Sequence, residues 1–360
     1  MSASATVAAP AKVRKFPCPS CGADVVWSPG AARLQCPYCG AEQEIPTSSA
    51  AVAERPLEAA LAAALAAPAA VGWGSARRTV RCPRCGAVES LDANVAASRC
   101  SFCGTPGVVE AEASSTMARP QGLVPFRVDR DRAATTFRGW LSGLWLRPSD
   151  LKIRARLATI EGVYIPFWTF DAATHSSWTA EAGYHYTVRS GNRTETRTRW
   201  EKASGFLEYF IDDLPVPSSH GLEPELVRKI EPFGTGKLVD YAPEFLSGFH
   251  AEENAVSLPD AFALAKVRMQ QIVFAECGKA VPGDTHRNLR VDTRYSGLAF
   301  KNALLPIWIA AYDYKGEIFR FLINGETGKV AGRAPWSWIK ITLLVLGLAT
   351  AFLLFQWLTN

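Results

Sequence analysis

Cysteine carries the strongest chemical signal in this chain of 360 residues. Eight of the nine cysteines fall into two copies of one pattern, in which two Cys-x-x-Cys turns are separated by fourteen residues. The two-residue gap lets both thiolates of a turn reach one ion, and two such turns complete a tetrahedral site. The sequence therefore predicts two four-cysteine metal sites. Their ligands are Cys18, Cys21, Cys36 and Cys39 in the first set, and Cys82, Cys85, Cys100 and Cys103 in the second.

Zinc is the metal that this donor set favours. Disulfides, a redox-active pair and an iron site are the alternatives, but two matched sets without a secretory leader favour zinc in a reducing compartment. A catalytic zinc normally has three protein ligands and an open position, whereas four cysteines close the coordination shell. We therefore expect two structural zinc ions, which supply folding energy to two short zinc ribbons.

The charge of the N-terminal third argues against nucleic acid as a partner. Residues 1–118 hold ten Lys and Arg against nine Asp and Glu. Eight thiolates and two divalent ions change this balance from +1 to about −3. Nucleic-acid affinity depends largely on clustered cations that neutralise phosphates. The one dense basic run, between Arg77 and Arg84, is more typical of a solvated face.

The C-terminal segment has the composition of a membrane span. Ile341 to Leu358 carries no charge, and eighteen residues extend about 27 Å as a helix, close to the thickness of the hydrocarbon core. Trp336 and Trp338 stand before it, at the depth that aromatic rings prefer. Basic residues lie only on its N-terminal side, so we expect a single-pass anchor in the cytoplasmic membrane with the bulk of the chain in the cytoplasm.

The chain between these features predicts a multidomain protein. We expect an α+β domain with a largely antiparallel sheet, because helical patterns at 131–144, 222–230 and 260–276 alternate with strand patterns and a hairpin at 184–200. The predicted units are a first zinc ribbon (1–49), an Ala-rich linker (50–76), a second ribbon (77–109), a linker (110–120), the α+β cytoplasmic domain (121–333) and the membrane anchor (334–360).

Two apolar strands of this domain resemble one another, and each contains a proline. The segment from Val163 to Trp168 has Pro166, and the segment from Leu304 to Trp308 has Pro306. Proline inside an apolar strand indicates a sheet edge or a bulge. The pair is either a duplicated β element or a coincidence in a chain with eleven tryptophans.

Residues 300–340 also carry a family resemblance. Phe300 to Trp308, then Tyr312-Asp-Tyr314, then Asn324 to Val330 and a hydrophobic span, together with N-terminal ribbons, resemble bacterial TFIIB-type zinc-ribbon membrane proteins, which are often labelled primosomal protein N′-like. Some of those proteins are encoded beside SPFH-domain and phage-shock-type proteins. The resemblance implies a role in recruiting such scaffolds to the membrane.

No constellation of residues in the sequence predicts catalysis. The segment Gly234-Thr-Gly236-Lys237 lacks the other residues of a phosphate-binding loop, and Asp212-Asp213 is more typical of an acidic strand end than of a metal site. We therefore expect a non-enzymatic, tail-anchored adaptor that holds cytoplasmic proteins at the membrane. The alternatives are a membrane-tethered nucleic-acid-binding protein, and an enzyme whose site lies in residues 121–330.

Overall fold

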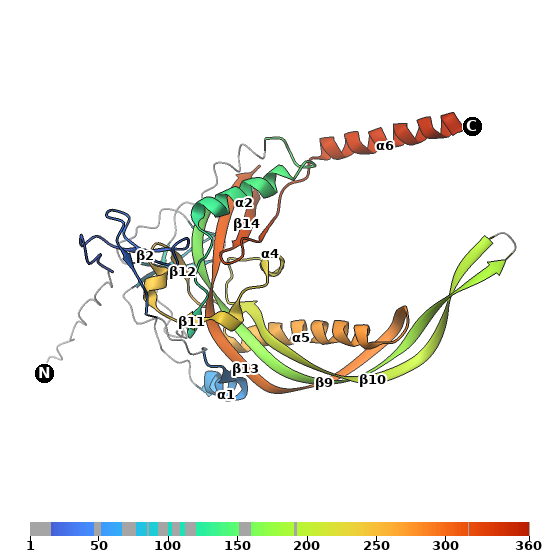
Figure 1. Ribbon diagram of the computed structural model, residues 1–360, viewed down its shortest axis with the longest axis horizontal. Coiled ribbons are helices and arrows are strands. Elements are labelled where there is room, and N and C mark those ends of the chain that lie inside the picture. Colours follow the sequence, from blue (N-terminus) through green and yellow to red (C-terminus); the bar gives the residue numbers. More distant parts are fainter. Residues whose placement is uncertain are drawn as a thin grey trace.

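The computed structural model describes residues 16–46, 52–66, 77–84, 86–92, 100–102, 109–111, 120–150, 160–190, 193–315 and 317–359. Three unusually long strands dominate it. They are β9 (Ile160–Ser190), β10 (Arg193–Pro217) and β13 (Thr285–Tyr314). The central strand β9 pairs antiparallel with both of the others. The result is a curved three-stranded arm that projects from the rest of the molecule (Figure 1).

A single long helix covers the concave face of this arm. The helix α5 (Leu258–Ala280) begins at Ser257, whose side-chain hydroxyl accepts a hydrogen bond from the backbone N–H of Asp260. Its small and apolar residues Ala261, Ala265 and Met269 are fully buried. Figure 1 shows the helix lying along the strands of the arm. The helix therefore fixes the curvature of the arm by burying one face of the sheet.

At its base the arm joins a larger, mostly antiparallel sheet, with twelve strands in the described part of the chain. Strand β13 continues as a hairpin into β14 (Glu317–Asn324), which pairs with β15 (Val330–Gly332). The short strands of this sheet are β4 (Arg55–Pro56), β5 (Arg77–Arg81), β6 (Val88–Asp92), β7 (Val109–Ala111), β8 (Gly122–Leu123), β11 (Val239–Asp240) and β12 (His250–Glu252). A separate small sheet holds β1 (Val26–Ser28), β2 (Arg33–Gln35) and β3 (Glu42–Gln43).

Helices surround the base of the sheet. They are α1 (Leu57–Ala66), α2 (Arg130–Ser142), α4 (Pro224–Ile230) and the 3-10 turns η1 (Thr235–Lys237) and η2 (Pro243–Leu246), followed by the C-terminal α6 (Trp338–Thr359). The three helices expected in the α+β domain are present as α2, α4 and α5. The prediction of a sheet-rich α+β fold with a largely antiparallel sheet is confirmed.

The two prolines of the repeated motif lie in interior strands. The expectation that these strands lie at a sheet edge was wrong. Pro166 and Pro306 lie in β9 and β13, which are direct neighbours. Beside Pro166 the neighbour changes from β12, whose last partner is Tyr164, to β10, whose pairing reaches Phe167. Beside Pro306 it changes from β8 to β14 in the same way. Each proline thus occupies a gap between two neighbouring strands, where its missing N–H removes no ladder hydrogen bond.

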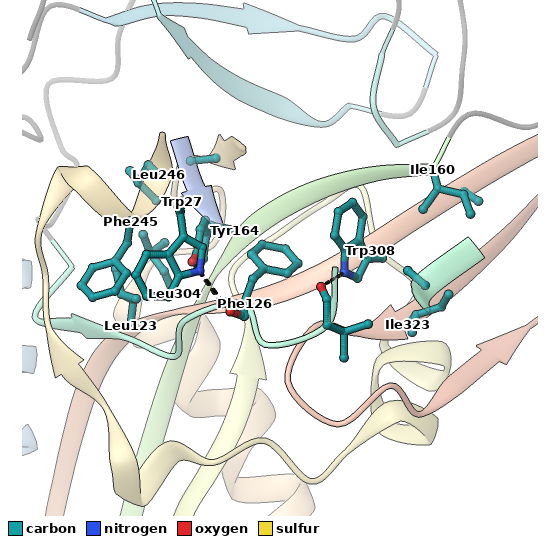
Figure 2. Close-up of a cluster of buried hydrophobic side chains, with 14 of the residues drawn as sticks. Trp27, Leu123, Phe126, Ile160, Tyr164, Phe245, Leu246, Leu304, Trp308 and Ile323 are labelled. Carbon is teal, nitrogen blue, oxygen red and sulfur yellow. Dashed lines mark hydrogen bonds between the residues drawn. The ribbon is translucent and has the colours of Figure 1, made fainter. Parts of the chain in front are cut away.

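The core at the base of the sheet is rich in aromatic rings (Figure 2). Phe126 stacks on Phe249 with a centroid distance of 4.2 Å and meets Tyr164 and Trp308 edge-on. Two indole N–H groups of this core have partners, since Trp308 donates to the carbonyl of Val128 at 2.9 Å and Trp27 donates to the carbonyl of Phe126 at 3.0 Å. Aromatic packing of this kind adds stability beyond the area that it buries.

Candidate metal centre and membrane segment

The first four cysteines converge on one point. Their Sγ atoms all lie within 4.8 Å of one another, with Cys18 and Cys39 at 3.5 Å and Cys21 and Cys36 at 3.5 Å. A zinc–sulfur bond of about 2.3 Å in a tetrahedron requires sulfurs about 3.8 Å apart. The four side chains therefore fit a tetrahedral metal ion, and the predicted convergence of the four cysteines at 18–39 into a group that could hold a metal is confirmed.

Two matching backbone turns position these thiols. In the first, the N–H of Gly22 donates to the carbonyl of Cys18 at 2.9 Å, and in the second the N–H of Gly40 donates to the carbonyl of Cys36 at 3.0 Å. Both glycines have a positive φ, of 76° and 74°, which a residue with a side chain adopts only with strain. The glycine after each Cys-x-x-Cys pair is thus a requirement of the turn.

The same turns prepare thiolates for a cation. Backbone N–H groups of Ser20 and Cys21 lower the pKa of Cys18 to about 6, and those of Cys39 and Tyr38 lower the pKa of Cys36. The N–H of Ala23 acts on Cys21 in the same direction, but protons shared with Cys36 and Cys39 outweigh it and raise the pKa of Cys21 to about 12. A cation that replaces those protons would remove this competition between the thiols.

The second cysteine set repeats part of this geometry. The N–H of Gly86 donates to the carbonyl of Cys82 at 3.0 Å, and the N–H of Cys82 donates to the carbonyl of Ala87 at 2.9 Å. Gly86 has a φ of 74°, the same as Gly40. The backbone N–H of Phe102 donates to the Sγ of Cys100 at 3.4 Å. Cys85 and Cys103 lie outside the described residues, so the four thiols of this set are not seen together.

The first cysteine region, which holds β1–β3, is attached to the base of the sheet by a buried tryptophan. The indole N–H of Trp27 donates to the carbonyl of Phe126 at 3.0 Å, and its ring meets Phe245 edge-on at 4.7 Å (Figure 2). Ser247 accepts from the N–H of Trp27 through its carbonyl and donates its hydroxyl to the carbonyl of Val25 at 2.6 Å. The buried cysteines Cys18 and Cys36 belong to the same hydrophobic cluster.

The second cysteine region is packed against the opposite side of the sheet base. Phe102 is fully buried with Ala87, Cys82 and Cys100 in a cluster that includes residues of β9, β13 and α4. Its carbonyl accepts a hydrogen bond from Arg320 of β14 at 3.1 Å. The strands around this set, β5, β6 and β7, pair with one another, and β6 pairs with β12 of the main sheet. Both cysteine regions therefore contribute to the cores of the main sheet.

The helix α6 is long and apolar enough to span a membrane. It covers twenty-two residues, its most apolar eighteen-residue stretch has a mean hydropathy of 2.1, and none of its residues is buried. Ile341 and Leu358 lie inside it, Trp338 begins it, and Trp336 precedes it, so the expected anchor residues belong to one continuous segment. The helix starts three residues before the uncharged run, and the hydroxyl of Ser337 accepts a hydrogen bond from the N–H of Lys340 in the first turn.

A loop between α2 and β9 holds the start of α6. The guanidinium of Arg147 lies 3.5 Å above the ring of Trp336, and the ammonium of Lys340 donates to the carbonyls of Trp145 and Arg147 at 3.1 and 2.8 Å. Trp145 is itself 62 % exposed. The sequence reasoning missed this second contributor, although an exposed Trp next to Arg is the composition of a membrane–water interface.

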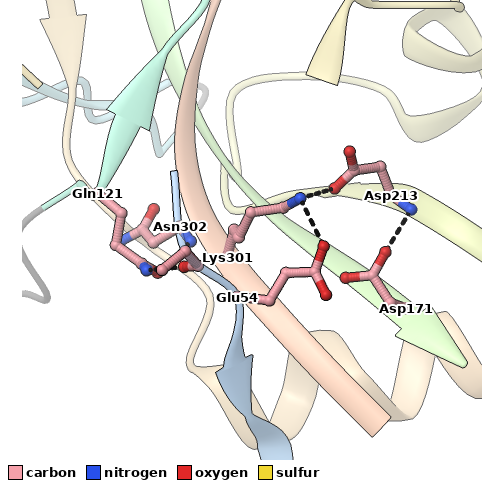
Figure 3. Close-up of polar contacts among 7 residues, drawn as sticks. Glu54, Gln121, Asp171, Asp213, Lys301 and Asn302 are labelled. Carbon is pink, nitrogen blue, oxygen red and sulfur yellow. Dashed lines mark hydrogen bonds and ion pairs between the residues drawn. The ribbon is translucent and has the colours of Figure 1, made fainter. Parts of the chain in front are cut away.

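Of the acidic pair near the end of β10, Asp213 belongs to a buried ion-pair cluster at the root of the arm (Figure 3), whereas Asp212 is exposed. The ammonium of Lys301 lies 2.7 Å from Asp213 and 3.3 Å from Glu54, and the backbone N–H of Asp213 donates to Asp171 at 2.7 Å. Burial raises the pKa of Asp171 to about 6. Burial alone would lower the pKa of Lys301, but the ion pair with Asp213 outweighs it, and the pKa of Lys301 is raised. A lysine nucleophile requires a lowered pKa, so this cluster is suited to a structural role.

The ninth cysteine is equally unsuited to nucleophilic chemistry. Cys277 is fully buried on the inner face of α5, and burial raises the pKa of its thiol. A buried thiol of raised pKa behaves as a small apolar side chain.

Comparison with known proteins gives a relative without an assigned activity. The chain is similar to the uncharacterized protein YdjG of Bacillus subtilis (strain 168), with 29% identity over 235 residues that cover 64% of this chain and 68% of that protein. No family model matches the chain, and no solved structure matches it.

Proposed function

We propose that this protein is a non-enzymatic, zinc-stabilised adaptor that α6 anchors in the cytoplasmic membrane, with its ribbons and its sheet in the cytoplasm. The observation that carries this proposal is the closed four-thiol cluster built into the base of a sheet whose C-terminal helix can cross a membrane. Four thiolates leave no open coordination position, so the metal holds structure rather than activating a substrate.

Two zinc ions complete the proposal. The turn at Cys82–Ala87 has the hydrogen bonds and the glycine conformation of the two turns of the first site, and the N–H directed at Cys100 is the kind of contact that stabilises a metal-bound thiolate. With Cys85 and Cys103 as the remaining ligands, the second set would hold its own zinc. Zinc is the ion that such all-cysteine sites select in a reducing compartment.

The exposed parts of the first ribbon favour a protein partner over a nucleic acid. Tyr38, between the last two ligands, is 83% exposed, and such aromatic side chains are enriched in protein interfaces. The described ribbon, residues 16–46, holds one arginine against three acidic residues. A zinc ion with four thiolates adds two further negative charges, so this surface would repel phosphates.

The interface around α6 supports the membrane part of the proposal. Trp145, Trp336, Arg147 and Lys340 gather at its N-terminal end, where rings and cations prefer the boundary between water and lipid. The cations lie on the side of the sheet, which supports our proposal that the sheet faces the cytoplasm. The partners that we propose are cytoplasmic proteins, with SPFH-domain scaffolds as the first candidates from the resemblance of the sequence.

An affinity purification from mildly solubilised membranes tests this function. The full chain and a Tyr38→Ala variant are purified in parallel, and proteins and nucleic acids are quantified in the same eluates. We expect a stoichiometric protein partner without nucleic acid, and less of that partner with the variant. Nuclease-sensitive DNA or RNA in place of a protein would instead favour a membrane-tethered nucleic-acid-binding protein.

A further inference from the structure

The three-stranded arm has two outer edges, and they differ in regularity. On one side, β13 is interrupted by irregularities in its pairing between Arg287 and Arg290 and between Ser296 and Ala299. On the other side, β10 pairs with β9 without a break from Arg193 to Ile211. Proteins commonly protect a sheet edge from association by means of bulges. The β13 edge is protected in this way, and the β10 edge is not.

The free side of β10 has no partner strand in the part of the chain that the structure describes. Beyond β9, its principal neighbour is α5, which lies over the concave face and reaches the backbone only at the root, where Arg268 donates to the carbonyl of Pro215. A long, regular and unpaired edge presents a row of N–H and C=O groups that a further strand can use.

The side chains of β10 are complementary to themselves in one antiparallel register. When Gly205 lies opposite Gly205 of a second copy, Lys202 lies opposite Glu208 and Trp200 lies opposite Phe210, and the two-fold symmetry forms each pair twice. Shifting this register by two residues along one strand places Lys202 opposite Phe206 or Phe210 instead, and removes the charge pairing.

The exposed rings of β10 agree with this arrangement. Phe206 is 87% exposed and Phe210 is 58% exposed, on the face of the arm away from α5. Gly205 packs beneath the indole of Trp178 on the other face, where a Cβ atom would lie 2.6 Å from that ring. One face of β10 is therefore packed within the arm, whereas two phenylalanine rings on its other face are exposed to water. This exposure is unfavourable unless another surface covers the rings.

We infer that two copies of this protein associate through their β10 strands, antiparallel and centred on Gly205, so that two three-stranded arms form one six-stranded sheet. The partner is a second copy of the chain because the edge matches its own sequence in charge and in aromatic pairing. The inference depends on the arm alone and not on the proposed adaptor function.

A charge-reversal cycle tests this contact in the full chain, reconstituted in lipid nanodiscs or detergent micelles, with the dimer fraction measured by mass over a dilution series. Lys202→Glu and Glu208→Lys each place like charges opposite one another twice, and we expect each to weaken the dimer roughly tenfold. The double variant Lys202→Glu/Glu208→Lys should restore it. Six residues of a strand separate the two positions by about 20 Å, so a contact within one chain cannot explain the restoration.

Arg290→Glu is the matched control, because it reverses an exposed charge on the same face of the arm but on β13. We expect it to leave the dimer unchanged, and α6 is identical in all variants. The inference is overturned if the wild-type chain is monomeric throughout the dilution series, if the double variant stays as weak as the single ones, or if Arg290→Glu weakens association as much as Lys202→Glu.

Discussion

At the scale of single residues, the geometry of the cysteine turns suits a metal ion as the shared partner of the four thiols. Cys18 and Cys36 are buried in the core that also contains Trp27 and Phe126, so the loss of the ion would leave thiolates or shared protons inside an apolar cluster. Their pKa values are lowered by backbone N–H groups, which favours metal binding at neutral pH.

Replacing Cys18 with Ser should therefore remove one zinc ion per chain and destabilise the protein by more than about 4 kcal/mol, since loss of a metal belongs to the largest single-residue effects. Metal analysis and thermal unfolding of the purified full chain provide the measurement. Cys277→Ser is the control, because Cys277 is a buried cysteine outside both sets. Equal zinc content in the Cys18 variant and the wild type would contradict the assignment.

The buried Asp171 gives a pH-dependent prediction. Its pKa is raised from 3.8 to about 6, so the folded state binds its proton more tightly than the unfolded state does, and the group disfavours folding increasingly as the pH rises from about 4 to about 6 and fully above that. Asp171→Asn should raise the free energy of unfolding at pH 8 by at most about 3 kcal/mol, and this gain should disappear as the pH falls from 6 towards 4.

Chemical denaturation at pH 8, 6 and 4 measures this difference. Asp292→Asn is a suitable control because Asp292 is an exposed carboxylate of the same arm. An Asp171→Asn chain that is less stable than the wild type at pH 8 would show that the carboxylate stabilises the cluster with Lys301.

At the scale of elements, several features follow directly from local sequence patterns. The helices α2, α4 and α5 are present where apolar periodicity places them, and α5 begins two residues before the expected 260, at Leu258, with Ser257 as its cap. The Cys-x-x-Cys-Gly turns were equally predictable, because only glycine adopts the required φ at low cost. The alternating residues correctly predicted the hairpin at 184–200. In the structure this hairpin is only the tip of a much longer pair of strands.

The length of the arm was not predictable from the same patterns. Gly183 and Gly205 interrupt the alternation that marks a strand, yet each lies opposite a tryptophan, Trp200 and Trp178, whose ring fills the space of the missing side chain. Pro166 and Pro306 also argued against interior strands. Their tolerance depends on where neighbouring strands begin and end, which is a property of the assembled sheet.

The docking of the first ribbon onto the sheet is the element-scale contact that a substitution can test. Trp27→Phe keeps a ring against Phe245 but leaves the buried carbonyl of Phe126 without its donor. We expect a loss of about 1–3 kcal/mol and faster hydrogen exchange in residues 241–249, with the zinc content unchanged. Loss of zinc in this variant would show that metal binding by the first cysteine region depends on its docking onto the sheet.

At the scale of the whole molecule, the sheet, the cysteine regions and α6 form one continuous structure. Both cysteine regions share hydrophobic clusters with the main sheet, and the segment before α6 is held by Arg147 and Trp145. The predicted linker at 50–76 includes Leu57, which is fully buried, and Glu54, which contacts Lys301. Sequence composition predicted a spacer because a segment rich in Ala and Pro gives no pattern from which these few specific contacts could be predicted.

Removing the chain from Trp336 onward should release the protein from membranes. The truncated protein keeps the described sheet contacts, which end near Gly332 in β15, and we expect it in the soluble fraction after cell lysis. Fusing an unrelated apolar span to the truncated chain should return it to the membrane fraction. A truncated protein that stays with the membrane after a high-salt wash would show that another surface provides the attachment.

We propose that two closed zinc sites stabilise the base of a membrane-anchored sheet. Zinc K-edge absorption on the full chain, purified from the membrane fraction with its metal content quantified, tests it most directly. The account predicts two zinc ions per chain, each with four sulfur ligands at about 2.3 Å. A chain without zinc, or zinc with nitrogen, oxygen or water in its coordination shell, would contradict it.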